Sequence, residues 1–469
     1  MAESCEDGKK TKKDSEVVCC SSFTRVILLM TVICITLPIN LVISWPAVLP
    51  KVEEDTADFI VTKEDVSWLV SVVSIIGIIA STFAGFLLEL LGPKRMVVLA
   101  LLPKAGFWLL MAFTPYLSLL YVGRVGLAFV NCFLCTAFQP LLAELSSPEK
   151  RGVISASSEV VAAAAMLLGY MLAHFLSWRP ATAVPAAPCL LILVLMFFVP
   201  ESPYWLVRKN RKDEAERSLK RLRGPGCDVS EQLDAISVAA SKNKTSISSQ
   251  IIQLKKRENG LPMLLLWLIF ILREFGGKNA MFSYSVYTFH QANVQIDPFI
   301  CTILLGAIRL LGHIISAFTI DYVGRKPFLA GSSLFCGLSV LVSGLFLMLE
   351  LPGKSWVSLG LLLVYVLSYG LGIGPITWIY IGELLPTPVR PLGSSLMVFT
   401  HSLGGFAMNY TFFKITSQLG LGLTLLIFSV PNFVVLIIVC FWLPETRGRS
   451  LEELQDAFRK KTESSPGTS

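Results

Sequence analysis

The chain has 469 residues, of which 54% are hydrophobic and only 16% are charged, and its mean hydropathy is +0.65. Soluble domains of this length carry much more charge, so the composition excludes a soluble protein and predicts a membrane protein. The formal net charge of +7 indicates membrane topology and contact with anionic lipid, and nothing suggests binding of nucleic acid.

Apolar stretches long enough to cross a bilayer as helices recur along the whole chain. A hydrocarbon core needs roughly 20 apolar residues per helix, and windowed hydropathy gives about twelve such stretches. They lie near residues 23–46, 64–90, 95–113, 116–140, 152–176, 182–199, 261–289, 296–320, 327–349, 355–382, 392–415 and 420–443. We therefore predict an all-α membrane protein whose partners are the lipid bilayer and a small-molecule substrate.

The segment before the first span, residues 1–22, is charged and lacks a small-residue cleavage site, so we predict a cytoplasmic tail and no cleaved signal peptide. Lysine and arginine collect there and at alternate connections, for example in "GPKR" (92–95), whereas the connection at 51–67 is acidic. By the positive-inside rule, both termini are predicted to be cytoplasmic.

One long interruption, residues 200–260, separates six predicted spans from six others. It begins with "VRKNRKDEAERSLKRLRG" (207–224), which is typical of basic amphipathic helices at a membrane surface. Six spans, a basic linker and six spans are the pattern of a duplicated transporter. The predicted domains are a tail (1–22), a bundle (23–199), a helical linker (200–260), a second bundle (261–443) and a C-terminal tail (444–469).

The seventh predicted span contains the unusual stretch "LREFGGKNAMFSYSVY" (272–287), with three charged side chains around Gly276 and Gly277. A glycine pair can unwind a membrane helix and expose backbone groups to a solute, and the alternative is close packing of helices against small residues. In the tenth span, Pro375 removes a backbone hydrogen bond beside Gly374. We predict Gly276, Gly374 and Pro375 as hinge residues.

Acidic and basic residues recur at matching helix ends in the two halves. "GFLLELLGPKR" (85–95) corresponds to "SAFTIDYVGRKP" (316–327), and "AELSSPEKRG" (143–152) corresponds to "GELLPTPVRP" (382–391). Partly hydrated ion pairs of this kind contribute only about 1 kcal/mol each, so they can break and form again in a cycle. They are predicted to hold the cytoplasmic faces of the two halves closed.

Together, "GRVGLAF" (123–129), "PESPYWLVRKNRKDEAERSLKRLRG" (200–224), "DYVGRK" (321–326), "GIGPITWIYIGELLPTPVRP" (372–391) and "PETRGRSLEEL" (444–454) resemble the sugar porter family of the major facilitator superfamily. The closest likeness is to its facilitated trehalose and glucose transporter-like members. The resemblance covers residues 22–458 and implies twelve transmembrane helices in two pseudo-symmetric six-helix bundles, a cytoplasmic helical linker and alternating access around a central site.

The resemblance also implies a cytoplasmic gate of ion pairs, with the linker and tail docked onto it. Its residues in this sequence would be Glu89, Arg95, Arg124, Glu144, Arg151, Glu201, Asp321, Arg325, Glu383, Arg390 and Glu445. The family usually has basic residues where this chain has Leu90 and Pro93, which predicts a weaker lock in the first half.

Residues that bind substrate in the family fall on a polar set in the middle of the spans. In this sequence they are Glu159, Arg273, Glu274, Gly277, Asn279, Tyr284, Arg309, Trp378 and His401. Gly277, Asn279, Tyr284 and Trp378 match the family. Ser283 replaces an aromatic residue, and the other five positions carry ionisable side chains where the family has amides.

The ionisable residues leave several interpretations open. Charges inside a bundle cost roughly 2.5 to 3.5 kcal/mol each, so they pair or face a water-filled path. They could form an internal cluster that only satisfies burial, or present both signs to a zwitterionic or acidic solute. In a third interpretation Glu159, Glu274 or His401 carries a proton with the substrate.

The predicted function is transport of a small polar solute, a sugar such as glucose or trehalose, at the plasma membrane. The first span contains no acid, whereas proton-driven members of the family have an aspartate there, so facilitated diffusion is favoured. The alternatives are a carrier of charged or zwitterionic organic solutes, proton-coupled or not, and a non-transporting sugar sensor. No enzyme motif, metal-ligand spacing or cofactor motif is present, so no activity as an enzyme is expected.

Overall fold

The computed structural model describes residues 28–145, 151–223, 252–351, 353–385 and 389–447, with short pieces between 229 and 237. Throughout this part of the chain the regular elements are helices, as predicted. The predicted N-terminal tail and the C-terminal tail from residue 448 onward lie outside the described residues.

The first half of the chain forms one helical bundle. Its elements are α2 (Thr36–Ser44), η1 (Trp45–Val48), α3 (Leu49–Glu54), α4 (Lys63–Leu91), α5 (Pro93–Phe113), α6 (Leu117–Leu145), α7 (Arg151–Phe175), α8 (Trp178–Ala183) and α9 (Ala186–Met196). Helix α6 packs on α4 and α5, α2 packs on α7, and α9 packs on α5. Two short helices, α10 (Pro203–Arg208) and α11 (Lys212–Arg223), follow in the linker.

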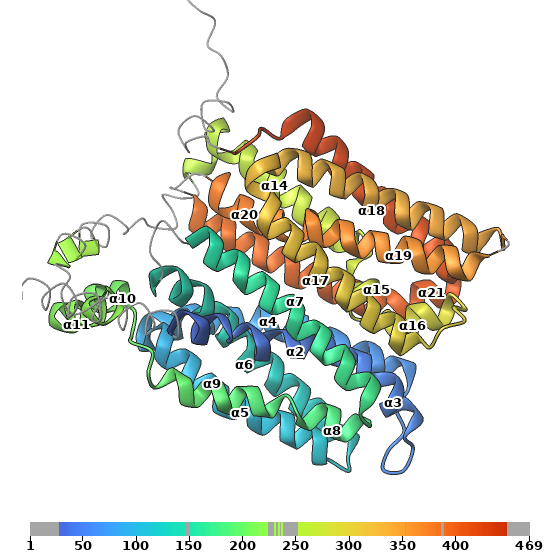
Figure 1. The fold of residues 1–469 in the computed structure, drawn as a ribbon, viewed down its shortest axis with the longest axis horizontal. Coiled ribbons are helices and arrows are strands. Elements are labelled where there is room, and N and C mark those ends of the chain that lie inside the picture. The colour runs from blue at the N-terminus through green and yellow to red at the C-terminus, as the bar shows by residue number, and fades with distance from the viewer. Residues whose placement is uncertain are drawn as a thin grey trace, which may run out of the picture.

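The second half forms a matching bundle. Its helices are α14 (Arg257–Phe275), α15 (Lys278–Phe282), α16 (Ser285–Gln291), α17 (Pro298–Val323), α18 (Arg325–Met348), α19 (Lys354–Leu371), α20 (Ile373–Glu383) and α21 (Arg390–Trp442). Helix α21 comprises two helices, because Gly420 has a non-helical φ of 74°. Figure 1 shows the two bundles side by side, and they meet where α7 packs on α17 and α4 packs on α21.

Ten helical stretches in the described part of the chain are long and apolar enough to cross a membrane. Large apolar side chains such as Phe86, Phe113, Phe318 and Phe441 remain more than half exposed on these helices. In water such a surface would be unfavourable, whereas in a bilayer it contacts acyl chains. The fold is therefore that of a multi-pass membrane protein.

The bundle has two distinct ends. Helices α10 and α11 lie at the end where α4 meets α5, and we call this the linker end (Figure 1). Helices α3, α8 and α16 lie at the opposite end, which we call the far end (Figure 1). The far end contains the acidic connection between the first two spans.

Two spans of the second half are broken. Helix α14 ends at Phe275, and Gly277 has a φ of 93°, a conformation that costs other residues about 1 to 2 kcal/mol. The second break falls at Gly372, with φ −129° and ψ −74°, so the predicted hinge at Gly374 and Pro375 is displaced. Both residues lie in the first turn of α20, where N–H groups have no partner within the helix and proline loses nothing.

Candidate functional site

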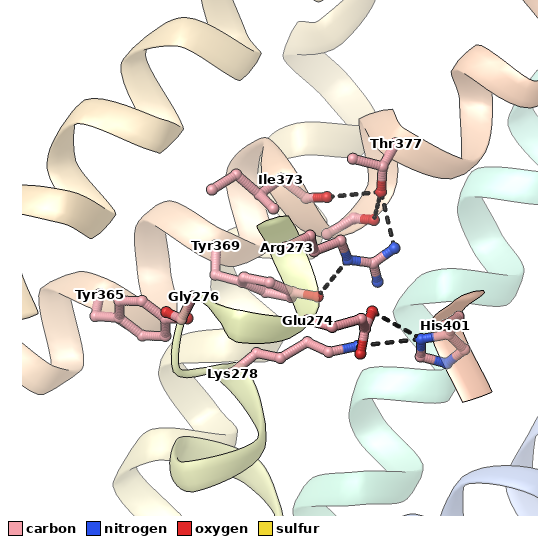
Figure 2. Close-up of polar contacts among 10 residues, drawn as sticks. Arg273, Glu274, Gly276, Lys278, Tyr365, Tyr369, Ile373, Thr377 and His401 are labelled. Carbon is pink, nitrogen blue, oxygen red and sulfur yellow. Dashed lines mark hydrogen bonds and ion pairs between the residues drawn. The ribbon is translucent and has the colours of Figure 1, made fainter. Parts of the chain in front are cut away.

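A group of charged side chains lies where the seventh span breaks. Glu274, in the last turn of α14, is fully buried, and both of its carboxylate oxygens lie 2.7 Å from Nζ of Lys278 on α15. Nδ1 of His401, on α21, lies 2.9 Å from Oε1 of Glu274 and 3.2 Å from Nζ of Lys278. Figure 2 shows these three side chains pointing toward one another. Glu274 and Lys278 are four residues apart, a spacing that brings side chains together on a helix face, and Lys278 neutralises Glu274.

Arg273 is adjacent to Glu274 in sequence but bonds to other helices. Its Nε donates to the hydroxyl of Tyr369, 3.0 Å away, and its Nη1 donates to Oγ1 of Thr377, 2.9 Å away (Figure 2). The guanidinium also lies 5.4 Å from the ring centroid of Trp378 and 5.5 Å from that of Phe270. Hydroxyl acceptors and aromatic faces together satisfy a cation that is only 7% exposed.

Arg309 lies at the contact between the two halves. Its Nη1 points at the Met166 sulfur, 2.5 Å away on α7, and its Cζ lies 4.3 Å from the ring centroid of Phe282. Its Nε lies 3.5 Å from Nε2 of His313. Glu159, also on α7, interacts electrostatically with both Arg309 and Arg273. These side chains and the Glu274 group form the central cluster, which comprises Glu159, Arg273, Glu274, Lys278, Arg309 and His401.

Backbone groups freed by the break in the seventh span find side-chain partners. The carbonyl of Gly276 accepts from the hydroxyl of Tyr365 at 2.9 Å and from Nδ2 of Asn432 at 3.1 Å. A side chain at Gly277 would meet the Phe428 ring at 3.0 Å. Neighbouring helices therefore stabilise the interruption, and the close packing that the sequence offered as an alternative is present as well.

The remaining predicted binding residues differ in their accessibility. Trp378 is partly exposed and packs edge-on against His401, with 5.5 Å between ring centroids. Asn279 carries a buried Nδ2 that has no hydrogen-bond partner among the described residues. Tyr284 is fully buried, stacks on Phe412 at 4.7 Å and donates to the carbonyl of Asn409. Tyr284 is thus in no position to contact a solute in this conformation, which corrects its predicted binding role for this state.

Several residues of the site were missed in the sequence. Tyr369, Thr377, Phe270 and Tyr365 supply partners to the broken span. Tyr369 and Thr377 lie in "SYGLGIGPITW" (368–378), but the break at Gly372 disturbs helical spacing, so periodicity does not bring them together. The only available signal was the polar character of these side chains inside an apolar span.

The linker end carries the same hydrogen-bonded arrangement in both halves. In the first half, Oε1 of Glu201 accepts from the backbone N–H of Lys94 at 3.0 Å, at the start of α5. In the second half, Glu445 accepts from the N–H groups of Arg325 and Lys326, both at 3.0 Å, at the start of α18. An acid placed at a helix N-terminus interacts favourably with the helix dipole.

The residues beside these acids also correspond. Ser202 donates to Glu144, and Thr446 donates to Glu383 over 2.6 Å. A glycine with positive φ precedes each acid-bound helix, Gly92 in the first half and Gly324 in the second. A side chain at Gly324 would meet Glu445 at 2.8 Å. The motifs repeated in the sequence therefore form equivalent hydrogen bonds in the two halves.

Glu445 lies outside the membrane-spanning segments, and its environment shifts its acidity. Burial by itself raises the pKa of this carboxyl, but the N–H groups of Arg447, Arg325, Lys326 and Thr446 bond to the ionised form. The net effect is a pKa below the ordinary value for glutamate. The segment that follows α21 is thus held to α18 by a carboxylate that remains charged.

The other predicted gate residues divide into three groups. Glu89 lies 3.5 Å from Arg208 and 3.4 Å from Lys209, in and after α10, and Arg95 lies 6.0 Å from the ring centroid of Trp205. Arg325 pairs with Glu383 at 3.2 Å. The side chains of Arg151, Asp321 and Arg390 lie outside the described part of the structure.

Arg124 does not belong to the linker end, which corrects its predicted place in the cytoplasmic gate. Helix α6 starts at Leu117 beside the far end, so Arg124 lies two turns from that end. The buried guanidinium donates to the carbonyls of Leu69 and Val42 and lies 4.7 Å from the ring centroid of Trp45. Residues 117–145 run from the far end toward the linker end, so Arg124 near the start of this span lies far from the predicted gate.

Several contacts between the two halves lie at the far end. Glu53 on α3 lies 2.7 Å from Nζ of Lys63 on α4 and accepts from the hydroxyl of Tyr287 on α16 at 3.0 Å. Lys63 lies 4.7 Å from the ring centroid of Tyr287. We call Glu53, Lys63 and Tyr287 the far-end latch, because it joins elements of the first half to one of the second.

Further contacts close the same end. Lys51 lies 5.0 Å from the ring centroid of Phe299, and the Trp68 ring lies 5.0 Å from that of Tyr410. By contrast, the gate contacts described at the linker end each join parts of one half. Within the described residues no group of three or more His, Cys, Asp or Glu side chains could hold a metal ion.

Comparisons with known proteins place these features in context. The family model described as "Sugar (and other) transporter" matches residues 30–458. The facilitated trehalose transporter Tret1 of Apis mellifera ligustica is 28% identical over 418 residues, which are 88% of this chain and 83% of that protein. Tret1 of Aedes aegypti is 29% identical over 87% of this chain, and the chain spans only 52% of that protein.

Solved structures share the fold. The proton:xylose symporter XylE of the major facilitator superfamily, bound to 6-bromo-6-deoxy-D-glucose, is 19% identical with a TM-score of 0.77, over 94% of this chain and 100% of that one. The inward open conformation of XylE from E. coli is 20% identical with a TM-score of 0.75, over 92% and 100% of the two chains. At this identity the likeness establishes the fold alone.

Proposed function

The chain belongs to the sugar (and other) transporter family, and from this premise we propose that it carries a sugar across a membrane by facilitative alternating access. As a member of this family it is a transporter and not an enzyme. The observation that carries the proposal is that contacts between the two halves close the far end. Polar side chains in the middle of the bundle, among them Arg309 and Trp378, remain partly exposed.

The proposed architecture has twelve spans in two halves of six. Of the ten candidate spans, nine count once each, and Leu392–Trp442 counts as two because it is interrupted at Gly420. Helices α14, α15 and α16 together form a broken seventh span, which brings the number to twelve. The halves correspond to residues 23–199 and 261–443, joined by the helical linker at 200–260. Both termini are proposed to be cytoplasmic, at the plasma membrane, which makes the linker end the cytoplasmic end.

Alternating access follows from the pairs that cross between the halves. The far-end latch joins the halves, whereas the contacts of Glu201 and Glu445 lie within single halves. His401 keeps 38% of its side chain exposed although it lies deep in a span. This combination supports a state in which the central cluster is accessible from the linker end, and the cycle requires the far-end latch to break.

The proposed substrate is a sugar because the relatives named above are trehalose transporters and because the site offers suitable groups. Trp378 presents an aromatic face, and Asn279 carries a buried amide donor without a partner among the described residues. Such groups suit a ring with several hydroxyls. Facilitative transport is proposed because residues 23–46 contain no acidic side chain.

Uptake into proteoliposomes that contain the purified full chain tests this function. Labelled glucose and trehalose are offered with and without an inward proton gradient, beside protein-free liposomes. We expect saturable uptake of sugar at the same rate in both conditions. Uptake that occurs only with the gradient would contradict the facilitative mechanism, and sugar binding without any flux would favour the sensor.

A further inference from the structure

The central cluster carries an unbalanced charge. It contains three basic side chains, Arg273, Lys278 and Arg309, and two acidic side chains, Glu159 and Glu274. Glu274 and Lys278 neutralise each other, with Nζ 2.7 Å from both oxygens. Two guanidiniums then remain with the single carboxylate of Glu159, so the cluster has a formal charge of +1 when His401 is neutral.

Neither guanidinium forms an ion pair with a carboxylate among the described residues. Arg273 bonds to two hydroxyls, and Arg309 contacts a thioether and an imidazole, which are neutral acceptors. Glu159 acts on both through space only. Arginine offers five N–H donors in a planar arrangement that matches a carboxylate. Arg309 in particular therefore has N–H donors that can bond to a carboxylate of a ligand.

Arg309 is the more accessible of the two cations. It is partly exposed, whereas Arg273 is buried behind Tyr369 and Thr377. It lies on α17 against Met166 of α7, at the contact between the halves where family members with this architecture alternate access. A group bound to Arg309 would therefore touch both halves.

Aromatic rings lie between the two guanidiniums. The Arg309 Cζ lies 4.3 Å from the ring centroid of Phe282, which lies 5.3 Å from that of Tyr369. The Tyr369 centroid lies 5.8 Å from Cζ of Arg273. Both rings are buried, so they surround the guanidiniums with apolar groups, where a cation is stabilised most by an anionic partner.

From this arrangement we propose that the transported sugar is a sugar monoacid of the hexuronate class, with its carboxylate held by Arg309. The proposal rests on the sugar-carrier function above and specifies its substrate. A monoanion brings the net charge of the cluster to zero, and a neutral sugar leaves the cation unpaired in the bilayer interior. A dianion such as a sugar phosphate would overcompensate the cluster and meet the charge of Glu159.

The test compares three hexose compounds that differ only at C6, together with the disaccharide trehalose. Proteoliposomes holding the full chain are offered labelled D-glucuronate, D-glucose, trehalose and glucose 6-phosphate at equal concentrations. We expect glucuronate uptake to exceed glucose uptake by at least about tenfold, as a charge-assisted bond predicts. Glucuronate should also raise the unfolding temperature of the detergent-solubilised protein more than glucose does.

Variants of Arg309 provide the decisive comparison. Arg309→Gln should lower the ratio of glucuronate to glucose uptake by at least about tenfold, and Arg309→Lys should restore part of it by retaining the charge. Lys212→Gln, at an exposed position of α11, removes one positive charge far from the site and should leave the ratio unchanged.

The outcomes separate this inference from the function on which it rests. Uptake of glucose or trehalose without glucuronate would retain the sugar carrier and overturn the monoacid. Preferential uptake of glucose 6-phosphate would overturn it as well, as would an unchanged ratio in Arg309→Gln. If none of the four compounds is transported or raises the unfolding temperature, both proposals fail.

Discussion

Glu274 supplies the negative charge that balances the buried Lys278. Its carboxylate is fully buried, and it neutralises Lys278 while His401 contacts the same oxygen. The transfer of one unpaired ion into a low-dielectric interior costs more than the pair contributes, so each partner makes the other tolerable. The charges of the seventh span are thus mutually dependent.

Removal of one partner of this pair should destabilise the protein strongly. Glu274→Gln leaves the Lys278 ammonium buried without a counter-charge, and we expect a loss of about 3 to 5 kcal/mol. The double substitution Glu274→Gln with Lys278→Met should recover most of this loss. Thermal unfolding of the purified protein in detergent measures both, and equal stability of the two variants would contradict the dependence.

The docking of Glu445 should make stability depend on pH. Because its pKa is lowered in the folded state, its stabilisation is complete above the unfolded pKa of about 4.3 and is lost as the pH falls through the lower folded value. The difference in unfolding temperature between the wild type and Glu445→Gln should be present at neutral pH and vanish in acid. Glu214→Gln, at an exposed ion pair of α11, is the control and should show little effect at any pH.

Among the elements, the seventh span is broken beside its charged side chains. Helix α14 ends at Phe275, Gly277 has a left-handed conformation, and Lys278 at the start of α15 still pairs with Glu274 four residues earlier. Tyr365 and Asn432 satisfy the carbonyl of Gly276 from α19 and α21. The break is therefore stabilised by two other elements, α19 and α21, and does not require flexibility.

Gly277→Ala should disturb this element by a specific mechanism. The φ of 93° disfavours alanine by about 1 to 2 kcal/mol, and its Cβ would meet the Phe428 ring at 3.0 Å. Gly360→Ala, within α19 and with open space around it, should instead stabilise by about 0.5 to 1 kcal/mol. Unfolding temperatures of the two variants should move in opposite directions, and a shift of both in the same direction would count against the mechanism.

For the molecule as a whole, the polar contacts that join the two halves among the described residues include a group at the far end. Glu53 and Lys63 belong to the first half, and Tyr287 and Phe299 belong to the second. The equilibrium between the two open states of a carrier is set by the difference between the contacts at its two ends. The far-end latch is thus expected to favour opening at the linker end.

Tyr287→Phe should shift that equilibrium without loss of packing. The ring is retained, but the bond from the hydroxyl to Glu53 is lost, and a change of about 1 to 1.5 kcal/mol corresponds to about a five- to tenfold change in population. Distances between spin labels on α3 and α16 should then include a larger open fraction. Tyr121→Phe, which removes a bond to Asp65 inside the first half, should leave the distances unchanged.

The class of the molecule and its duplication can be inferred from the amino-acid sequence alone. Hydropathy is a local property of the chain, so long apolar stretches identify spans regardless of how they pack. The acids of "PESP" and "PETRGR" and their glycine-preceded helices recur in both halves, and the structure places Glu201 and Glu445 in equivalent bonds. Repeated motifs of this kind are visible without any coordinates.

Which charges meet, and at which end each residue lies, becomes clear from the three-dimensional arrangement of the helices. The sequence could not choose between partners for Arg273, because Tyr369 and Thr377 lie roughly a hundred residues away across a broken helix. The family resemblance implies a place for Arg124 in the cytoplasmic gate, whereas the structure places it near the far end, and the second break lies at Gly372, not at Gly374. Pairing depends on distances between segments remote in sequence, whereas insertion into a bilayer depends on each segment alone.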